Sequence, residues 1–144
     1  MKSSILTSVI LLAFTSSHAM AACPTTGLTG TQLVSLVSGK YACATRGGDK
    51  WDELHQGTGF GPSNVEDYKL GPTDPVDPTK VVGTYTISNG QSPDTISYNY
   101  GDPGGPYRYV VIKSPNPNPL DTTYFFCNVA TSEVFVVLIL PAHC

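Results

Sequence analysis

The run Trp51-Asp52-Glu53-Leu54-His55-Gln56 holds the densest group of residues that could do chemistry. On a β-strand alternate side chains point to the same face, so Trp51, Glu53 and His55 would share one side of a sheet. A carboxylate beside an imidazole suits acid/base chemistry, with Glu53 raising the pKa of His55 and orienting its ring. If the protein is an enzyme, Glu53 and His55 are therefore its predicted catalytic residues. The alternative is a solvated strand face with Trp51 packed at the mouth of a barrel.

Tyrosines form a second pattern. Tyr98 and Tyr100 share one face of a predicted strand, and Tyr107 and Tyr109 share one face of the next. If these strands pair, the four phenols line one side of the sheet and can stack against sugars, aromatic ligands or partner side chains. The alternative is cross-strand pairing that only stabilises the sheet; Arg108 would point away as a solvated charge. The predicted binding residues are Trp51, Tyr85, Tyr98, Tyr100, Tyr107 and Tyr109.

Metal and cofactor sites are weakly indicated. Asp74 and Asp77, in the proline-rich segment 71–78, offer oxygen ligands to calcium, but a calcium loop has more carboxylates at closer spacing. Aspartate before proline more often shapes a turn. We therefore expect neither a metal nor a cofactor.

The chain has four cysteines, at positions 23, 43, 127 and 144, and no C-x-x-C pair. In an oxidising compartment they are expected to form two disulfides, for which three connectivities are possible. We favour Cys43 with Cys127, because each lies in an apolar, strand-like segment, and Cys23 with Cys144, at the two ends of the domain.

The first 21 residues have the pattern of a signal peptide. Lys2 gives a basic start, Ile5 to Phe14 is apolar, and Ala19-Met20-Ala21 places small residues where a signal peptidase cuts. We expect cleavage after Ala21 or Ala22, leaving residues 22–144 as a single disulfide-linked β domain that is secreted or periplasmic. The alternative is that residues 20–23 form a lipobox, with Cys23 acylated and anchored to a membrane.

Charge excludes one class of partner. The chain has 8 basic and 11 acidic residues, and without Lys2 the balance is 7 against 11, a net charge of −4. Nucleic-acid binding needs a basic face, so we expect no nucleic-acid partner. Beyond the leader no apolar stretch is long enough to span a membrane. The oligomeric state is left open.

The elements that must position these residues are one helix and a series of strands. Leu28–Val37 is expected to be helical, capped by Thr29 or Thr31 and stopped at Gly39. Strands are expected at 41–45, 51–56, 66–70, 81–88, 95–100, 107–113, 122–129 and 133–140. Short loops favour an antiparallel up-and-down barrel or roll of 7 or 8 strands. Because the last strand is apolar on both faces, we expect the helix to cover its outer side.

The segment Gly83-Thr84-Tyr85 opens a strand where lipocalin-like (calycin) barrels often carry Gly-x-Trp. With its order of helix and strands, the chain resembles a small secreted lipocalin-like or protease-inhibitor-type barrel. Residues 36–43, followed by Trp51 and His55, also resemble short exported bacterial proteins of unknown function. This second resemblance implies no particular activity. The first resemblance implies binding inside the barrel or inhibition through its end loops.

Three alternative functions are therefore considered, in order of preference. The first is a non-catalytic exported binding protein that recognises a small molecule, a glycan or a protein through the aromatic sheet face or the barrel-end loops. The second is a small exported hydrolase using Glu53 and His55. The third is an envelope-associated structural subunit.

Overall fold

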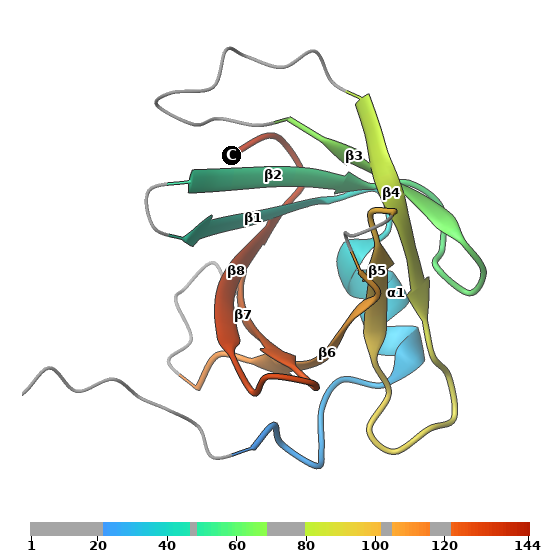
Figure 1. The fold of residues 1–144 in the computed structure, drawn as a ribbon, viewed down its shortest axis with the longest axis vertical. Coiled ribbons are helices and arrows are strands. Elements are labelled where there is room, and N and C mark those ends of the chain that lie inside the picture. Colours follow the sequence, from blue (N-terminus) through green and yellow to red (C-terminus); the bar gives the residue numbers. More distant parts are fainter. Residues whose placement is uncertain (1–21, 47–48, 69–79, 102–104, 116–121) are drawn as a thin grey trace, which may run out of the picture.

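The protein is a closed antiparallel β-barrel with one short helix, as seen in a computed structural model that describes residues 22–46, 49–68, 80–101, 105–115 and 122–144 (Figure 1). Each strand pairs with its neighbours in the sequence, and β8 closes the barrel against β1. The elements are α1 (Gly30–Val37), β1 (Tyr41–Arg46), β2 (Asp49–His55), β3 (Ser63–Asp67), β4 (Lys80–Ile87), β5 (Ile96–Asn99), β6 (Tyr107–Lys113), β7 (Thr123–Asn128) and β8 (Val134–Leu140).

This architecture confirms the predicted fold class. Most strand boundaries agree within one or two residues, whereas β3 starts three residues earlier than expected, at Ser63. Alternation along the strands separates an apolar interior from a more polar outside. The segment Gly83–Tyr85 lies in β4, where a side chain on Gly83 would collide with the carbonyl oxygen of Asn99 in β5. Glycine therefore lets β5 pass close to β4.

Helix α1 closes one end of the barrel. Its start is fixed by a capping box, in which the Thr29 hydroxyl accepts from the Gln32 amide and the Gln32 side chain accepts from the Thr29 amide. Leu33, Leu36 and Val37 are buried in the barrel core. Gly39, with φ of +68°, then turns the chain into β1.

The prediction that α1 covers the outer face of β8 is wrong. Val136 and Leu138, which point outward from β8, are 56% and 40% exposed. The apolar stripe of α1 instead faces the end of the barrel, where the chain before the helix bonds to β6 through Leu28 N and Val111 O. No helix in the described part of the chain is long and apolar enough to cross a membrane.

The predicted disulfide pairing is also wrong. The bridges are Cys23–Cys127 and Cys43–Cys144, with Cα atoms 5.6 and 6.0 Å apart. Cys43 lies on β1 and Cys127 on β7, and β8 runs between them. Two strand spacings amount to about 10 Å, whereas bridged Cα atoms lie within about 7 Å. The two strand cysteines therefore each bond to a cysteine near one end of the domain.

Candidate functional site

A cavity of about 460 Å³ lies in the half of the barrel remote from α1. The mouth of the cavity is at the end of the barrel where β2, β4, β6 and β8 begin. A volume of this size is in the range of small-molecule sites. Aromatic side chains make up much of its wall: Trp51, Tyr98, Tyr100, Tyr107, Tyr109, Phe126 and Phe135.

The predicted tyrosine stripe is confirmed as one continuous face, and it points into the barrel. Tyr98 is directly opposite Tyr107 in the register of β5 and β6, and opposite Tyr85 in the register of β4 and β5. The rings of Tyr98 and Tyr100 stack with centroids 6.1 Å apart. Tyr107 is 40% exposed and Tyr98 only 4%, so the stripe contains both an accessible and a buried ring.

Tyr85 lies below the cavity. It is fully buried, and its hydroxyl donates to the carbonyl oxygen of Gly57 at 2.8 Å. It is absent from the cavity wall, to which the five other predicted binding residues belong. Sequence reasoning missed Phe126, Phe135 and Asn128, which line the wall from β7 and the β8 strand. Their alternation in an apolar segment indicates an inner face but does not reveal a hollow beside it.

Glu53 is the central ionisable group of the wall. Its carboxylate accepts from the Tyr100 hydroxyl, with distances of 2.8 and 3.1 Å to its two oxygens. Burial raises the pKa of Glu53 to about 7, the Tyr100 hydrogen bond opposes this shift, and the charge of Asp67 adds to it. Asp67 is the residue opposite Glu53 in the register of β2 and β3.

His55 lies deeper and does not reach the cavity. It is fully buried; its Nδ1 is 3.1 Å from the Glu53 carbonyl oxygen and its Nε2 is 2.8 Å from the Tyr98 hydroxyl. Since a carbonyl only accepts, Nδ1 carries the proton and Nε2 accepts from Tyr98. Burial lowers the pKa of His55 to about 4, so the ring is neutral near pH 7.

The predicted relation between Glu53 and His55 is therefore corrected. Both residues and Trp51 do share one face of β2, but the Glu53 carboxylate is bonded to Tyr100, and only its backbone contacts His55. The pKa of His55 is lowered by burial rather than raised by a carboxylate. The alternative of a solvated face is also wrong, because this face points into the barrel. Alternation shows which residues share a face without showing which face is inside.

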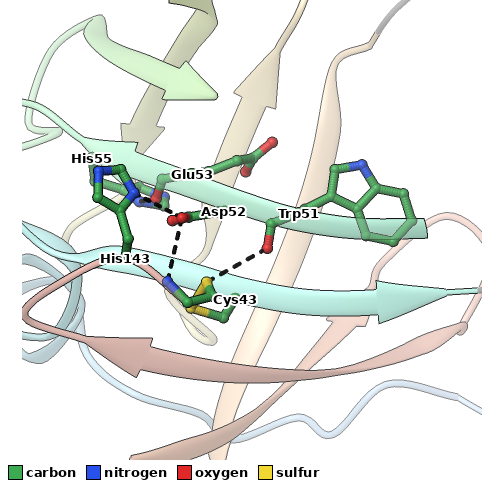
Figure 2. Close-up of a disulfide and its surroundings, with 7 residues drawn as sticks. Cys43, Trp51, Asp52, Glu53, His55 and His143 are labelled. Atoms are coloured by element: carbon green, nitrogen blue, oxygen red, sulfur yellow. Dashed lines mark hydrogen bonds and ion pairs between the residues drawn. A yellow bond between two sulfur atoms is a disulfide. The ribbon is translucent and has the colours of Figure 1, made fainter. Parts of the chain in front are cut away.

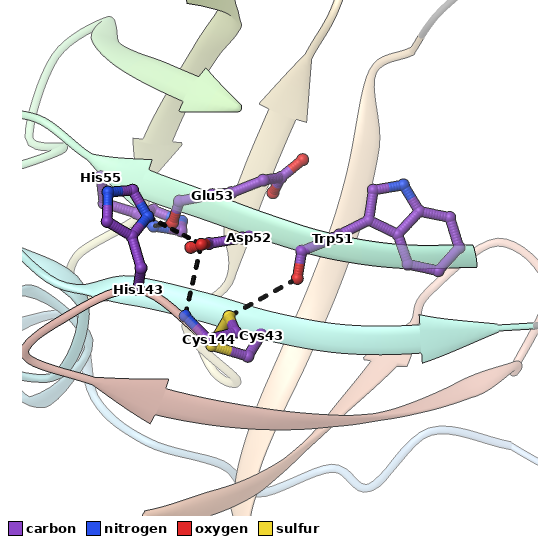
Figure 3. A network of polar contacts seen from close by, with 7 residues as sticks. All are labelled: Cys43, Trp51, Asp52, Glu53, His55, His143 and Cys144. Atoms are coloured by element: carbon purple, nitrogen blue, oxygen red, sulfur yellow. Dashed lines mark hydrogen bonds and ion pairs between the residues drawn. A yellow bond between two sulfur atoms is a disulfide. The ribbon is translucent and has the colours of Figure 1, made fainter. Parts of the chain in front are cut away.

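The opposite face of β2 contains a polar cluster that sequence reasoning missed. Asp52 is 1% exposed, and its Oδ2 is 2.8 Å from Nδ1 of His143 (Figure 2). The same oxygen accepts from the Cys144 amide at 3.3 Å (Figure 3). The His143 ring also packs against Tyr41 and Tyr68. These contacts hold the C-terminal residues beside β2, where Cys144 is bonded to Cys43 (Figure 3).

This cluster is not a metal centre as it stands. Ligand atoms of Cys43, Asp52 and Cys144 lie within 4.8 Å of one another, but the two sulfur atoms are bonded to each other. Cysteine binds a metal as a thiolate, which a disulfide does not offer. Asp74 and Asp77, which the sequence offers only weakly as calcium ligands, lie outside the described residues, as does the leader at 1–21.

Comparison with known proteins gives no relative. No protein-family model, curated protein or solved structure matches the chain. The resemblance to lipocalin-like barrels therefore stays an expectation from the sequence.

Proposed function

We propose that the protein is an exported, non-catalytic binding protein that holds a small organic molecule inside its barrel. The observation that supports this most directly is the cavity of about 460 Å³ whose wall is largely aromatic and contains a few polar groups. Such a combination is typical of sites for small ligands. Two disulfides are typical of proteins that mature in an oxidising compartment, which agrees with export.

The wall is organised before any ligand arrives. The Tyr98 hydroxyl is held by His55 and the Tyr100 hydroxyl by Glu53, both at 2.8 Å. Because these rings are already fixed, a ligand that stacks on them loses little side-chain freedom of the protein. In this proposal His55 positions Tyr98 and has no direct contact with the ligand.

Trp51 offers a direct test, because it is the only tryptophan of the chain and it lines the cavity. We expect library compounds that raise the melting temperature of the disulfide-intact protein also to change Trp51 fluorescence. Ala44, on the cavity wall, and Thr45, exposed on the outside of the same strand, provide a matched pair of variants. Ala44→Phe fills the cavity and should abolish binding, whereas Thr45→Phe should leave it unchanged.

Two results would contradict the proposal. Equal binding by the Ala44→Phe variant and the parent would place the ligand elsewhere on the molecule. A library of several chemical classes in which no compound changes either the melting temperature or the fluorescence would remove the case for a ligand cavity.

A hydrolase is the second candidate, and Glu53 is the observation that favours it. A carboxyl group with a pKa of about 7 on a cavity wall is suited to general acid/base catalysis at neutral pH. In such a hydrolase Glu53 would be the general acid/base, and His55 would only hold the Tyr98 hydroxyl by a hydrogen bond. Turnover of an ester, glycan or peptide that is lost in Glu53→Gln would favour the enzyme, whereas recovery of every bound compound unchanged favours the binding protein.

A further inference from the structure

We propose that the ligand of this cavity is an organic cation, an ammonium group on an apolar body, with its charge beside Glu53 and its body among the aromatic rings. The inference rests on the proposed function, because it names the class of ligand that the same cavity takes. Three features of the wall support it: the sign of its charges, the hydrogen-bonding groups that it leaves available, and the arrangement of its rings.

The charged lining residues that the structure describes are all acidic. Glu53 on β2, Asp67 on β3 and Glu133 before β8 line the cavity, and none of the described lining residues is a lysine or arginine. A negative wall of low polarity attracts a cation and repels an anion. Glu53 and Asp67 are opposite each other across β2 and β3, so a positive charge beside them would reduce the repulsion between two carboxylates.

Two hydroxyl protons in the middle of the wall are already used within the protein. The Tyr98 hydroxyl donates to His55 and the Tyr100 hydroxyl donates to Glu53, so neither proton is available to a ligand. A carboxylate has about four lone-pair sites, so Glu53 can accept from an ammonium group as well as from Tyr100.

The rings form a partial cage beside these carboxylates. Tyr98 has its centroid 6.1 Å from that of Tyr100 and 5.9 Å from that of Tyr109, and Tyr100 is 6.2 Å from Tyr107. The faces of tyrosine and tryptophan rings attract cations, and cages of such rings are used to bind quaternary ammonium groups. With Trp51 nearer the mouth, this cage suits a cation with an aromatic or alkyl body.

Binding is expected to release a proton below about pH 7. Burial raises the pKa of Glu53 to about 7. The groups that face it are Tyr98 on β5, Tyr100 just after β5, Asp67 on β3, Tyr109 on β6 and Glu133 on the same wall. None of these is cationic, so a bound ammonium ion would be the positive charge that favours ionised Glu53. The affinity for a cation should therefore decrease as the pH is lowered, by up to about a hundredfold between pH 8 and pH 5.

The test compares compounds that differ only in charge. Phenyl, naphthyl and decyl bodies, each carrying an ammonium, a hydroxyl or a carboxylate group, are titrated into the disulfide-intact protein by calorimetry at pH 8. We expect the ammonium compound of at least one body to bind about tenfold tighter than its alcohol, and the carboxylate to bind most weakly. At pH 6, titration in two buffers of different ionisation enthalpy should reveal proton release.

Two variants separate the local charge from the net charge. Glu53→Gln should reduce the preference for ammonium over alcohol to within about threefold and remove the dependence on pH. Glu66→Gln makes the same change in net charge at a residue that is absent from the cavity wall and is bonded to Gln56, and it should retain the preference. Proton release is measured on the parent protein, so the proposal stays testable even if Glu53→Gln does not fold.

The possible failures are distinguishable. An alcohol or carboxylate that binds as tightly as its ammonium counterpart overturns the cation proposal. If no compound of the set binds, but other library compounds change Trp51 fluorescence and are blocked by Ala44→Phe, the proposed function stands and the cation proposal fails. If nothing of any class binds, both fail.

Discussion

Two residues on one face of β2 have opposite protonation preferences. Burial raises the pKa of Glu53 to about 7 and lowers the pKa of His55 to about 4, because each group favours its neutral form in a low-polarity interior. Each keeps a hydrogen bond to a tyrosine hydroxyl: His55 to Tyr98 in β5, and Glu53 to Tyr100, the residue that follows β5. Two side chains on the same strand face thus differ in protonation: near neutral pH His55 is neutral, whereas Glu53 is close to its pKa.

The pH dependence of stability should reveal this pair. Unfolded Glu53 ionises near pH 4.5, whereas folded Glu53 keeps its proton until about pH 7, so its contribution to stability is full below pH 4.5 and lost as the pH rises. His55 acts in the opposite sense: its contribution is full above about pH 6.5 and lost as the pH falls toward 4. Between about pH 4.5 and pH 6.5 the two contributions change in opposite directions, so they should largely cancel in the parent protein.

Glu53→Gln should remove the contribution of Glu53 to this pH dependence. We expect the free energy of unfolding of the variant, relative to the parent, to rise by on the order of 3 kcal/mol from pH 4.5 to pH 7. Urea unfolding at several pH values measures the difference, and Glu66→Gln serves as the control. Parallel curves for the parent and Glu53→Gln would show that Glu53 titrates normally in the folded protein.

At the scale of elements, the sequence predicts each helix and strand separately better than it predicts their neighbours. Thr29 and Gln32 are three residues apart, so the capping box of α1 can be read from the sequence. The shared face of Trp51, Glu53 and His55 follows from alternation in the same way. The contact of Asp52 with His143 joins residues separated by 91 positions, and no local pattern indicates it. The cavity itself depends on the unfilled space between inner faces, which no single strand specifies.

The anchoring of α1 makes a prediction at this scale. The Asp94 carboxylate accepts from the amide of Gly30, the first residue of α1, at 2.7 Å and from the amide of Gln91 at 2.9 Å. The hydrogen bond from Gly30, above all, lowers the pKa of Asp94, although partial burial opposes the shift. A negative charge also interacts favourably with a helix N-terminus.

Asp94→Asn should therefore destabilise the protein at pH 7. Since the folded pKa is lowered, the contribution of Asp94 is present above the unfolded value of 3.8 and is lost as the pH falls further. The unfolding curves of the parent and the variant should thus approach each other at acid pH. A gap that stays constant from pH 7 to pH 3 would show that the charge contributes nothing at this helix end.

At the scale of the whole molecule, barrel closure decides which cysteines can meet. Cys43 and Cys127 are in strands, and a sequence-based pairing joins them, but β8 separates β1 from β7 once the barrel closes. Each strand cysteine is left facing outward, beside a chain segment that comes from one end of the domain. Cys127 holds the segment before α1, and Cys43 holds the segment after β8.

The two bridges provide a matched comparison, because they span 104 and 101 residues. In the chain-entropy model, removing either one by a double Cys→Ser change should cost about 4 to 5 kcal/mol, and nearly the same for both. Urea unfolding of Cys23→Ser/Cys127→Ser and Cys43→Ser/Cys144→Ser measures the two losses. A much larger loss for the second pair would indicate that the contacts of Asp52 with His143 and Cys144 depend on the bridge and add to its effect. Mass analysis of the unreduced, digested parent protein checks the pairing itself, since peptides joining Cys43 to Cys127 would contradict the strand order of the closed barrel.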